Sequence, residues 1–197
     1  MTLPSNGKLL YHLTHIKNIK GILQNGLMPR NQLNDSSFFN TANLDIIRGR
    51  ENLSMNLGDF VPFHFFVKNP YDGAVCAEFS SENMVIISIM RPKAGHENGY
   101  FIVPRHPLNG NPEILPYAEG FQKIKWDILD DIPNRDYSDS AIKQACLAEC
   151  DISRTIPKED FAFIYVKTEE GRKKVLALLN DKQTREKVKV NPNMFRR

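Results

Sequence analysis

Residues 10–15 are Leu10-Tyr11-His12-Leu13-Thr14-His15, an apolar and aromatic run in which polar side chains are embedded. The pattern predicts a strand over residues 8–13. Apolar side chains then recur near helical spacing, and Gly26 interrupts the pattern, so we predict a short helix over residues 16–25. A strand that ends in polar side chains and continues into a helix commonly forms one wall of a ligand pocket. We therefore expect a pocket where this strand ends.

Strand and helix patterns alternate irregularly along the rest of the chain. Apolar runs predict strands over residues 60–67, 84–90, 101–104 and 161–167. Helical patterns cover residues 42–53, 120–129 and 169–179, and residues 140–147 lead through Glu149 into an apolar stretch. Turn-forming residues cluster at 68–73, and prolines favour a long loop over 105–117. Because the order lacks βαβ regularity, we predict a single α+β domain over residues 1–197 rather than a doubly wound sheet. No glycine-rich dinucleotide fingerprint is present.

The composition supports a packed core. Hydrophobic residues make up 41% of the chain and charged residues 25%, which argues against global disorder. The net charge is only +3, from 26 basic and 23 acidic residues, so a nucleic-acid partner is compatible with the sequence but is not required by it. Much of the basic excess lies in residues 172–197.

Several classes of protein are disfavoured. Cys76, Cys146 and Cys150 are an odd number without paired spacing, which argues against a disulfide framework and against a zinc site. The first residues lack the pattern of a signal peptide, and no apolar run is long enough to cross a bilayer. We therefore expect no metal, no membrane association and a cytoplasmic location.

His12 and Thr14 are the first candidate ligand-binding residues. If Tyr11 and Leu13 face the core, His12 and Thr14 share the opposite face of the strand. A neutral imidazole and a hydroxyl at that position can form hydrogen bonds with a ribose or an amide. The alternative is that both are polar residues satisfied locally at a strand end.

Two arginines and a glutamate are the other candidates. Arg48 or Arg50 could clamp a diphosphate or pair with a carboxylate, although the spacing alone favours a solvated helix face. Glu149 lies in a stretch of small and apolar residues, where partial burial would suit a catalytic or paired carboxylate. A surface glutamate is the alternative. The aromatic residues from Phe60 to Phe66, with His64 among them, are better explained as core.

Four blocks in the same order make the chain resemble the DarT-type DNA ADP-ribosyltransferases. The first block is the opening from Tyr11 to Leu27, with Arg30-Asn31 after it. The others are Ala42-Asn43-x-Asp45-Ile46 with its arginines, Gly58-Asp59-Phe60-Val61-Pro62-Phe63-His64-Phe65, and Gln144 through Ala148-Glu149 to Ile156-Pro157. The resemblance covers most of the chain, from about residue 11 to about residue 167.

The resemblance implies the ADP-ribosyltransferase fold, a split mixed β-sheet around an NAD cleft with peripheral helices. It implies NAD as co-substrate, transfer of ADP-ribose to a base of single-stranded DNA, and release of nicotinamide. It further implies that the chain is the toxin of a toxin–antitoxin pair whose antitoxin is an ADP-ribosylglycohydrolase. The form of residues 64–73 is more similar to the guanine-modifying branch of the family than to the thymine-modifying one.

The resemblance also assigns roles to individual residues. Arg50 and Glu149 correspond to the active-site arginine and the catalytic glutamate. The cofactor-binding positions are His12, Leu13, Thr14, Gly21 and Arg50, and the candidates to touch the base are His106 and Tyr117. One departure is Asp151, which stands where an apolar residue usually follows the glutamate.

Three other functions stay open at this point. The same fold could transfer ADP-ribose to RNA or protein. A non-catalytic nucleic-acid-binding module with a basic C-terminal helix would bind DNA in a salt-sensitive way without consuming NAD. A ribonuclease that uses the scattered histidines would cut RNA without NAD.

Overall fold

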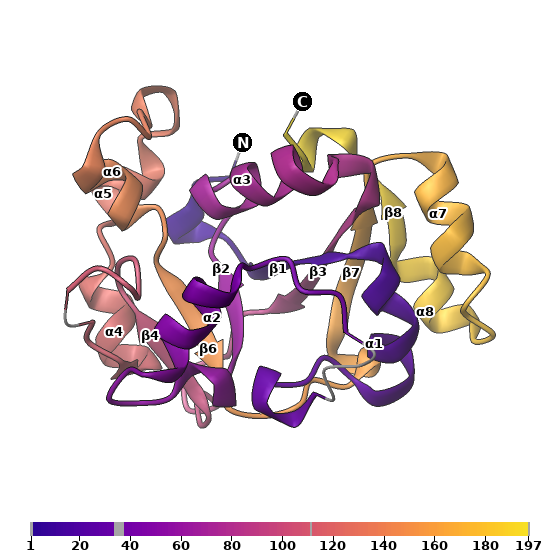
Figure 1. The fold of residues 1–197 in the computed structure, drawn as a ribbon, viewed down its shortest axis with the longest axis horizontal. Helices are drawn as coiled ribbons and strands as arrows, with labels where there is room; N and C mark the ends of the chain where they lie inside the picture. Colours follow the sequence, from indigo (N-terminus) through magenta and orange to yellow (C-terminus); the bar gives the residue numbers. More distant parts are fainter. Residues whose placement is uncertain (1, 34–37, 111, 197) are drawn as a thin grey trace.

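The computed structural model describes residues 2–33, 38–110 and 112–196. In these residues, eight strands form one sheet in the order β5-β4-β6-β2-β1-β3-β7-β8 (Figure 1). The strands are β1 (Leu9–His15), β2 (Val61–His64), β3 (Met84–Met90), β4 (Tyr100–Val103), β5 (Leu115–Pro116), β6 (Glu149–Ile152), β7 (Phe161–Val166) and β8 (Val188–Val190).

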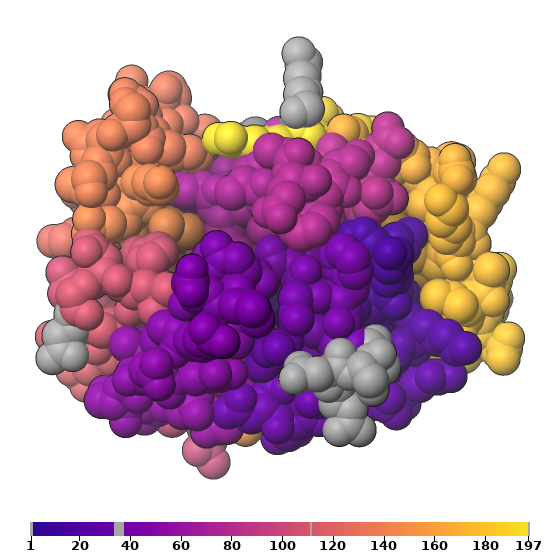
Figure 2. All heavy atoms as spheres, viewed as in Figure 1, coloured from indigo at the N-terminus to yellow at the C-terminus, as the bar shows by residue number. Residues whose placement is uncertain are grey.

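Eight α-helices of the described residues surround the sheet. They are α1 (Ile19–Asn25), α2 (Leu44–Glu51), α3 (Pro70–Phe79), α4 (Tyr117–Lys123), α5 (Trp126–Asp130), α6 (Ser140–Ala145), α7 (Glu169–Leu176) and α8 (Lys182–Lys187). Figures 1 and 2 share one view, in which α2 lies in front of the sheet and below α3. No helix of residues 2–33, 38–110 and 112–196 combines the length and the apolar character needed to cross a membrane.

The sheet is split between β1 and β2. Antiparallel pairing joins these strands at one residue pair, Tyr11 with His64, whereas β1 pairs with β3 along its whole length, from Leu9 opposite Met90 to His15 opposite Met84. The two halves are therefore β5-β4-β6-β2 and β1-β3-β7-β8. The sheet is mixed because β7 and β8 run parallel while the other neighbours are antiparallel. The predicted α+β fold with a split mixed sheet is confirmed.

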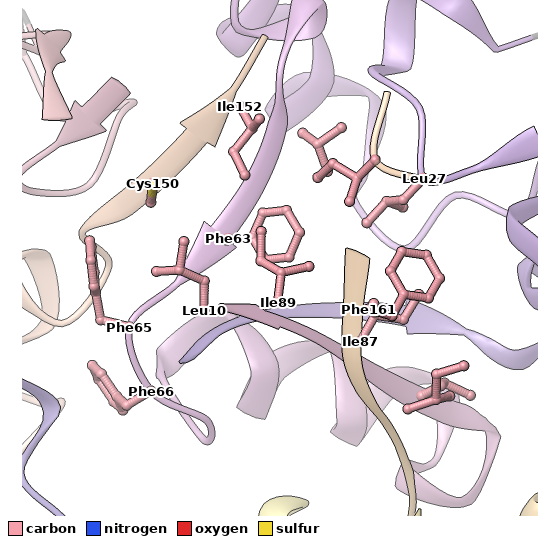
Figure 3. Packing of buried hydrophobic residues seen from close by; sticks show 14 of the residues in the cluster. Leu10, Leu27, Phe63, Phe65, Phe66, Ile87, Ile89, Cys150, Ile152 and Phe161 are labelled. Atoms are coloured by element: carbon pink, nitrogen blue, oxygen red, sulfur yellow. The ribbon is translucent and has the colours of Figure 1, made fainter. Parts of the chain in front are cut away.

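The main hydrophobic core crosses this split. Phe63 of β2 and Leu10 of β1 are both fully buried and belong to one cluster, which also contains Ile89 of β3. Figure 3 shows these three side chains close together, with Cys150 and Ile152 of β6 beside them. Side-chain packing on this face thus joins two half-sheets that share little backbone pairing.

A second cluster covers the opposite face of the sheet. It includes Leu13 of β1, Met84 of β3 and Val75 of α3. Strand β1 is therefore buried on both faces, because successive side chains of a strand point to opposite sides. This is why its sequence lacks a simple alternation of apolar and polar residues.

The predicted elements agree with the structure where the pattern is continuous. Strand β3 has the predicted bounds, while the strand predicted over 60–67 is limited to β2. The predicted turn at 68–73 is wrong in its second half, where α3 begins. The Asn69 side chain accepts a hydrogen bond from the Asp72 backbone N–H at 2.9 Å, and Pro70 occupies the first turn. These residues are start signals of a helix as well as turn formers.

Other differences lie near helix ends and in the C-terminal part. The helix predicted over 120–129 is two helices, because the backbone is extended at Ile124 between α4 and α5. The predicted loop over 105–117 contains β5 at its end. Helix α8 and strand β8 were not predicted, since α8 is short and rich in charged side chains and β8 has only three residues.

Replacing Phe63 tests the core that joins the half-sheets. We expect Phe63→Ala to lower the free energy of unfolding by about 3–5 kcal/mol, because it leaves a cavity under the split. Urea denaturation followed by circular dichroism measures the change. Leu44→Ala is the control, since Leu44 is 60% exposed, and should change stability by less than about 0.5 kcal/mol. Equal losses in the two variants would contradict this account of the core.

Candidate active site

A cavity of about 380 Å³ lies where β1 and β2 diverge. Strand β1 contributes His12, Leu13 and Thr14 to its lining, and β2 contributes Val61, Pro62 and His64. Other parts of the lining come from α2, from Phe38 and residues 40–42 before it, from the start of α3, from residues 106–108 and from Glu149 of β6. Met28, Arg30 and Lys143 also line the cavity. The split of the sheet therefore opens a space that residues distant in sequence can enclose.

Arg50 and Glu149 form an ion pair in this cavity. The Asn43 side chain caps α2 by accepting a hydrogen bond from the Ile46 N–H at 2.9 Å, and the last turn of the helix then carries Arg50 toward β6. The Arg50 Nη1 donates to Glu149 Oε2 at 2.7 Å. Arg48 is exposed and does not line the cavity. The position of α2 therefore selects Arg50, between the two arginines of the sequence, as the one at the site.

Asp151 binds the same guanidinium. Its Oδ1 accepts a hydrogen bond from Arg50 Nη2 at 3.2 Å, and its side chain is fully buried. Burial and the charge of the neighbouring Glu149 together raise the pKa of Asp151 to about 8, although Arg50 opposes both effects. Burial alone would lower the pKa of Arg50, but the charges of Glu149 and Asp151 raise it above its ordinary value. Arg50 therefore stays charged.

His12 is a neutral imidazole of known tautomer. Its Nδ1 lies 2.8 Å from the Pro62 carbonyl oxygen, which can only accept, so Nδ1 carries the hydrogen. Burial lowers the pKa of His12 to about 4, more than the hydrogen bond with Pro62 raises it. The Nε2 atom is therefore left as an acceptor near neutral pH.

Thr14 belongs to a network that fixes the chain over the cavity. The buried Asn18 donates from Nδ2 to Thr14 Oγ1 at 3.1 Å and to the Phe39 carbonyl oxygen at 3.0 Å. The Phe39 N–H donates to Asn18 Oδ1 at 2.8 Å. Asn18 thus ties β1 to Phe39, whose neighbours Phe38 and Asn40 line the cavity.

Six of the eight predicted site residues line the cavity. They are His12, Leu13, Thr14, Arg50, His106 and Glu149. Gly21 does not, because it lies on the exposed side of α1, whose buried side carries Ile19, Ile22 and Leu23. Tyr117 is 8% exposed and packs in the main core against Tyr100 and Phe121, outside the cavity lining.

Sequence reasoning expected residues 60–72 to help cover NAD but did not single out Tyr71, which lines the cavity. Tyr71 lies in the first turn of α3, and its hydroxyl is 3.2 Å from Thr41 Oγ1. Burial raises the pKa of Tyr71, so it is a neutral hydroxyl. The sequence feature that could have located Tyr71 is Asn69-Pro70, which starts α3. This start places Tyr71 at the end of α3 nearest the split of the sheet.

Metal-ligating side chains do not gather in the part of the chain that the structure describes: no group of three or more His, Cys, Asp or Glu residues there could hold an ion. The three cysteines are buried and free. The charged side chains that line the cavity are Arg30, Arg50, Glu51, Lys143 and Glu149.

Comparison with solved structures identifies the class of fold. DarT of Thermus sp. 2.9 in complex with ADP-ribosylated ssDNA superposes with a TM-score of 0.81 at 22% identity, covering 96% of each chain. The same protein in complex with NAD+ gives a TM-score of 0.74 at 23% identity, covering 96% of this chain and 98% of that one. Thermosipho africanus DarTG in complex with ADP-ribose gives 0.79 at 17% identity, covering 96% of this chain but 51% of that one. The fold is that of the DarT ADP-ribosyltransferases.

Sequence comparison then identifies the family. A DNA ADP-ribosyl transferase of Thermus sp. (strain 2.9) is 26% identical over 133 residues, which are 61% of this chain and 63% of that protein, so the match spans less than two thirds of the relative. The family model described as DarT, ssDNA thymidine ADP-ribosyltransferase, matches residues 11–196. The chain belongs to the DarT family.

Removing the charge of Arg50 should destabilise the protein. Arg50→Met leaves two buried carboxyl groups without their cation, and we expect the free energy of unfolding to fall by about 3 kcal/mol at neutral pH. Arg48→Met is the matched control on the same helix and should change it by less than about 0.5 kcal/mol. Urea denaturation of both variants provides the comparison. Similar effects of the two substitutions would mean that the ion pair does not hold α2 in place.

The charge state of His12 can be observed directly. Because its pKa is lowered to about 4, the ring should keep one hydrogen, on Nδ1, from about pH 5 to about pH 8. Long-range ¹H–¹⁵N NMR spectra of the imidazoles report this, and a His12→Gln variant assigns the signal. A doubly protonated ring at about pH 6 would disprove the assignment.

Proposed function

We propose that this chain is an NAD-dependent ADP-ribosyltransferase that modifies a base of single-stranded DNA and releases nicotinamide. The observation that carries the proposal is Glu149, held by Arg50 at 2.7 Å in a cavity at the split of the sheet. Membership of the DarT family supports the same reaction. So do the titles of related structures, which contain NAD+ and ADP-ribosylated ssDNA.

The cavity suits the parts of NAD. Arg50 has five N–H groups, of which the bonds to Glu149 and Asp151 use two, so donors remain for an anionic diphosphate. His12 offers an acceptor, and Thr14 keeps its own O–H as a donor after accepting from Asn18. These are the groups that ribose hydroxyls and a carboxamide require. NAD supplies the ADP-ribosyl group, and its nicotinamide is the leaving group.

Glu149 has two tasks in the transfer. The bond from ribose C1′ to nicotinamide breaks, a bond from C1′ to a base nitrogen forms, and that nitrogen loses a proton. A carboxylate beside the ribose stabilises the positive charge that develops on the sugar. Glu149 can also accept the proton. Arg50 cannot, because it stays charged, and it instead fixes the carboxylate of Glu149 by a charge-assisted hydrogen bond.

His106 is proposed to contact the base. Its Nδ1 accepts a hydrogen bond from the Leu108 N–H at 3.2 Å, and burial lowers its pKa. The neutral ring therefore carries its hydrogen on Nε2, which can donate to a base carbonyl. A base must leave its stack to enter a cavity of this kind, so single-stranded DNA is the expected substrate.

We propose guanine as the base that is modified. The support is the segment from residue 64 to residue 73, whose form resembles the guanine-modifying branch, and whose His64 and Tyr71 line the cavity. The family description names thymidine. The two alternatives predict different modified nucleosides, which one experiment separates.

We further propose that the chain is a single domain that acts in the cytoplasm as the toxin of a toxin–antitoxin pair. Its partner would be an ADP-ribosylglycohydrolase that removes the modification. The resemblance at residues 11–167 supports this role. Thermosipho africanus DarTG, only 51% of which is matched, carries further sequence beside the shared fold.

Labelling with NAD tests the reaction and the base together. The chain is incubated with labelled NAD and a random single-stranded DNA, and the digested nucleosides are analysed by mass spectrometry. We expect an ADP-ribosyl adduct on deoxyguanosine. Glu149→Gln should lower the rate by about a hundredfold to a thousandfold, since it removes the carboxylate that stabilises the developing charge. Glu119→Gln, an exposed change beside Lys123, should leave the rate unchanged.

Each other outcome favours another function. An adduct on thymidine would keep the reaction and overturn the choice of guanine. Adducts on RNA or protein in parallel incubations would overturn DNA as the substrate. Salt-sensitive binding to DNA without nicotinamide release would favour a non-catalytic module. If Glu149→Gln labels DNA as fast as the native chain, the proposed catalytic role of Glu149 is wrong.

A further inference from the structure

Asp151 is a second carboxyl group behind the ion pair of the cavity. Glu149 and Asp151 are two residues apart on β6, so both side chains lie on the same face of the sheet. Arg50 donates from Nη1 to Glu149 and from Nη2 to Asp151, which means that the two bonds hold both arms of its guanidinium. Arg50 and Glu149 line the cavity, whereas Asp151 does not. Asp151 therefore acts on a ligand only through Arg50.

The surroundings of Asp151 make its charge costly. The side chain is fully buried, and among the residues that the structure describes its Oδ2 has no hydrogen-bond partner. An unsatisfied carboxylate oxygen in such a place favours the protonated, neutral form. This agrees with the rise of the Asp151 pKa to about 8 by burial and by the charge of Glu149.

The groups that face this carboxyl group come from several elements. On β2 and β4 its cross-strand neighbours are Pro62 and Phe101, neither of which titrates. Arg50 from α2 and Glu149 from β6 are the charged groups that act on Asp151. Tyr71 from α3 and His106 from the loop after β4 interact with these two groups, and His64 from β2 and Lys143 from α6 lie near His106. Among these groups of the described residues, Arg50 is the cation that contacts Asp151. The proton on Asp151 therefore decides whether the charge of Arg50 meets one carboxylate or two.

We propose that Asp151 is a positioning residue for NAD, which anchors the second arm of the Arg50 guanidinium and sets, by gaining or losing a proton, how much positive charge Arg50 presents to the NAD diphosphate. The inference rests on the proposed function. When Asp151 is neutral, Arg50 and Glu149 form a balanced pair. When Asp151 is ionised, two carboxylates share one guanidinium and the cluster has a net negative charge, which repels an anionic ligand.

Binding of NAD at different pH values tests the proposal without catalysis. Isothermal titration calorimetry of the full chain with NAD, without DNA, gives Kd. We expect Kd to rise about fivefold from about pH 7 to about pH 9. In Asp151→Asn the amide oxygen can still accept from Arg50, but the group cannot ionise, so Kd should stay constant over this range. Asp151→Ala removes the anchor and should weaken binding at every pH.

A second measurement on the free protein keeps the test independent of NAD. The native pKa of Asp151 is raised, so the native chain should lose stability relative to Asp151→Asn as the pH rises from about 4 to about 8, and no further above that. Thermal denaturation of the two proteins measures the difference. Glu119→Gln controls for the loss of a carboxylate that is exposed.

The outcomes separate this inference from the proposed function. A Kd of the native chain that does not change with pH, or the same change in Asp151→Asn, would overturn the role of Asp151 and leave the proposed reaction standing. A stability difference that does not vary with pH would also overturn it. If the folded native chain does not bind NAD at any pH, the proposed function fails, and the inference fails with it.

Discussion

The active-site architecture depends on the divergence of β1 and β2. Two antiparallel strands that stayed paired along their length would close the sheet and leave no space between its halves. Here pairing is confined to Tyr11 and His64. Pro62, the second residue of β2, has no N–H and cannot donate a hydrogen bond to a neighbouring strand. The Pro62 carbonyl group instead accepts a hydrogen bond from His12. The hydrophobic core beneath, with Phe63 beside Leu10, keeps the halves together where the backbone does not.

The second constraint is the burial of charge. Helix α2 has no buried side chain of its own, so its place over the sheet is not set by an apolar stripe. Arg50 links it to Glu149 and Asp151 of β6, and Gly49 allows a close approach to Leu108, whose side chain a Cβ would meet at 3.1 Å. Opposite charges in a buried site attract each other strongly because little water screens them, so each holds the other in position. The same interaction therefore orders the carboxylate of Glu149 and positions the helix that covers it.

The sequence predicted continuous apolar elements well and the site in part. Met84 to Met90 is apolar at almost every position, and its strand has the predicted bounds. Arg50 and Glu149 were identified from a resemblance, whereas spacing alone favoured a solvated helix face and a surface strand. Gly21 and Tyr117 lie away from the cavity because the side that a helix presents is decided by its packing, which local sequence does not contain. Asp151 is 101 positions from Arg50, and no local pattern could have paired them.

The two cavity histidines show how backbone hydrogen bonds give identical side chains different chemistry. His12 donates from Nδ1 to a carbonyl group, so its Nε2 is an acceptor, whereas His106 accepts at Nδ1 from a backbone N–H, so its Nε2 is a donor. Burial lowers the pKa of both rings and keeps them neutral, which preserves this difference near neutral pH. His12 on β1 therefore accepts a hydrogen bond from a donor group of a ligand, whereas His106 in the loop at 106–108 donates one to an acceptor group. A ligand that offers a donor to His12 and an acceptor to His106 satisfies both rings. If the two rings were protonated, both would be donors and the difference between them would be lost, because an imidazolium donates from both nitrogens. Burial of the two rings therefore maintains the opposite hydrogen-bonding roles of their Nε2 atoms.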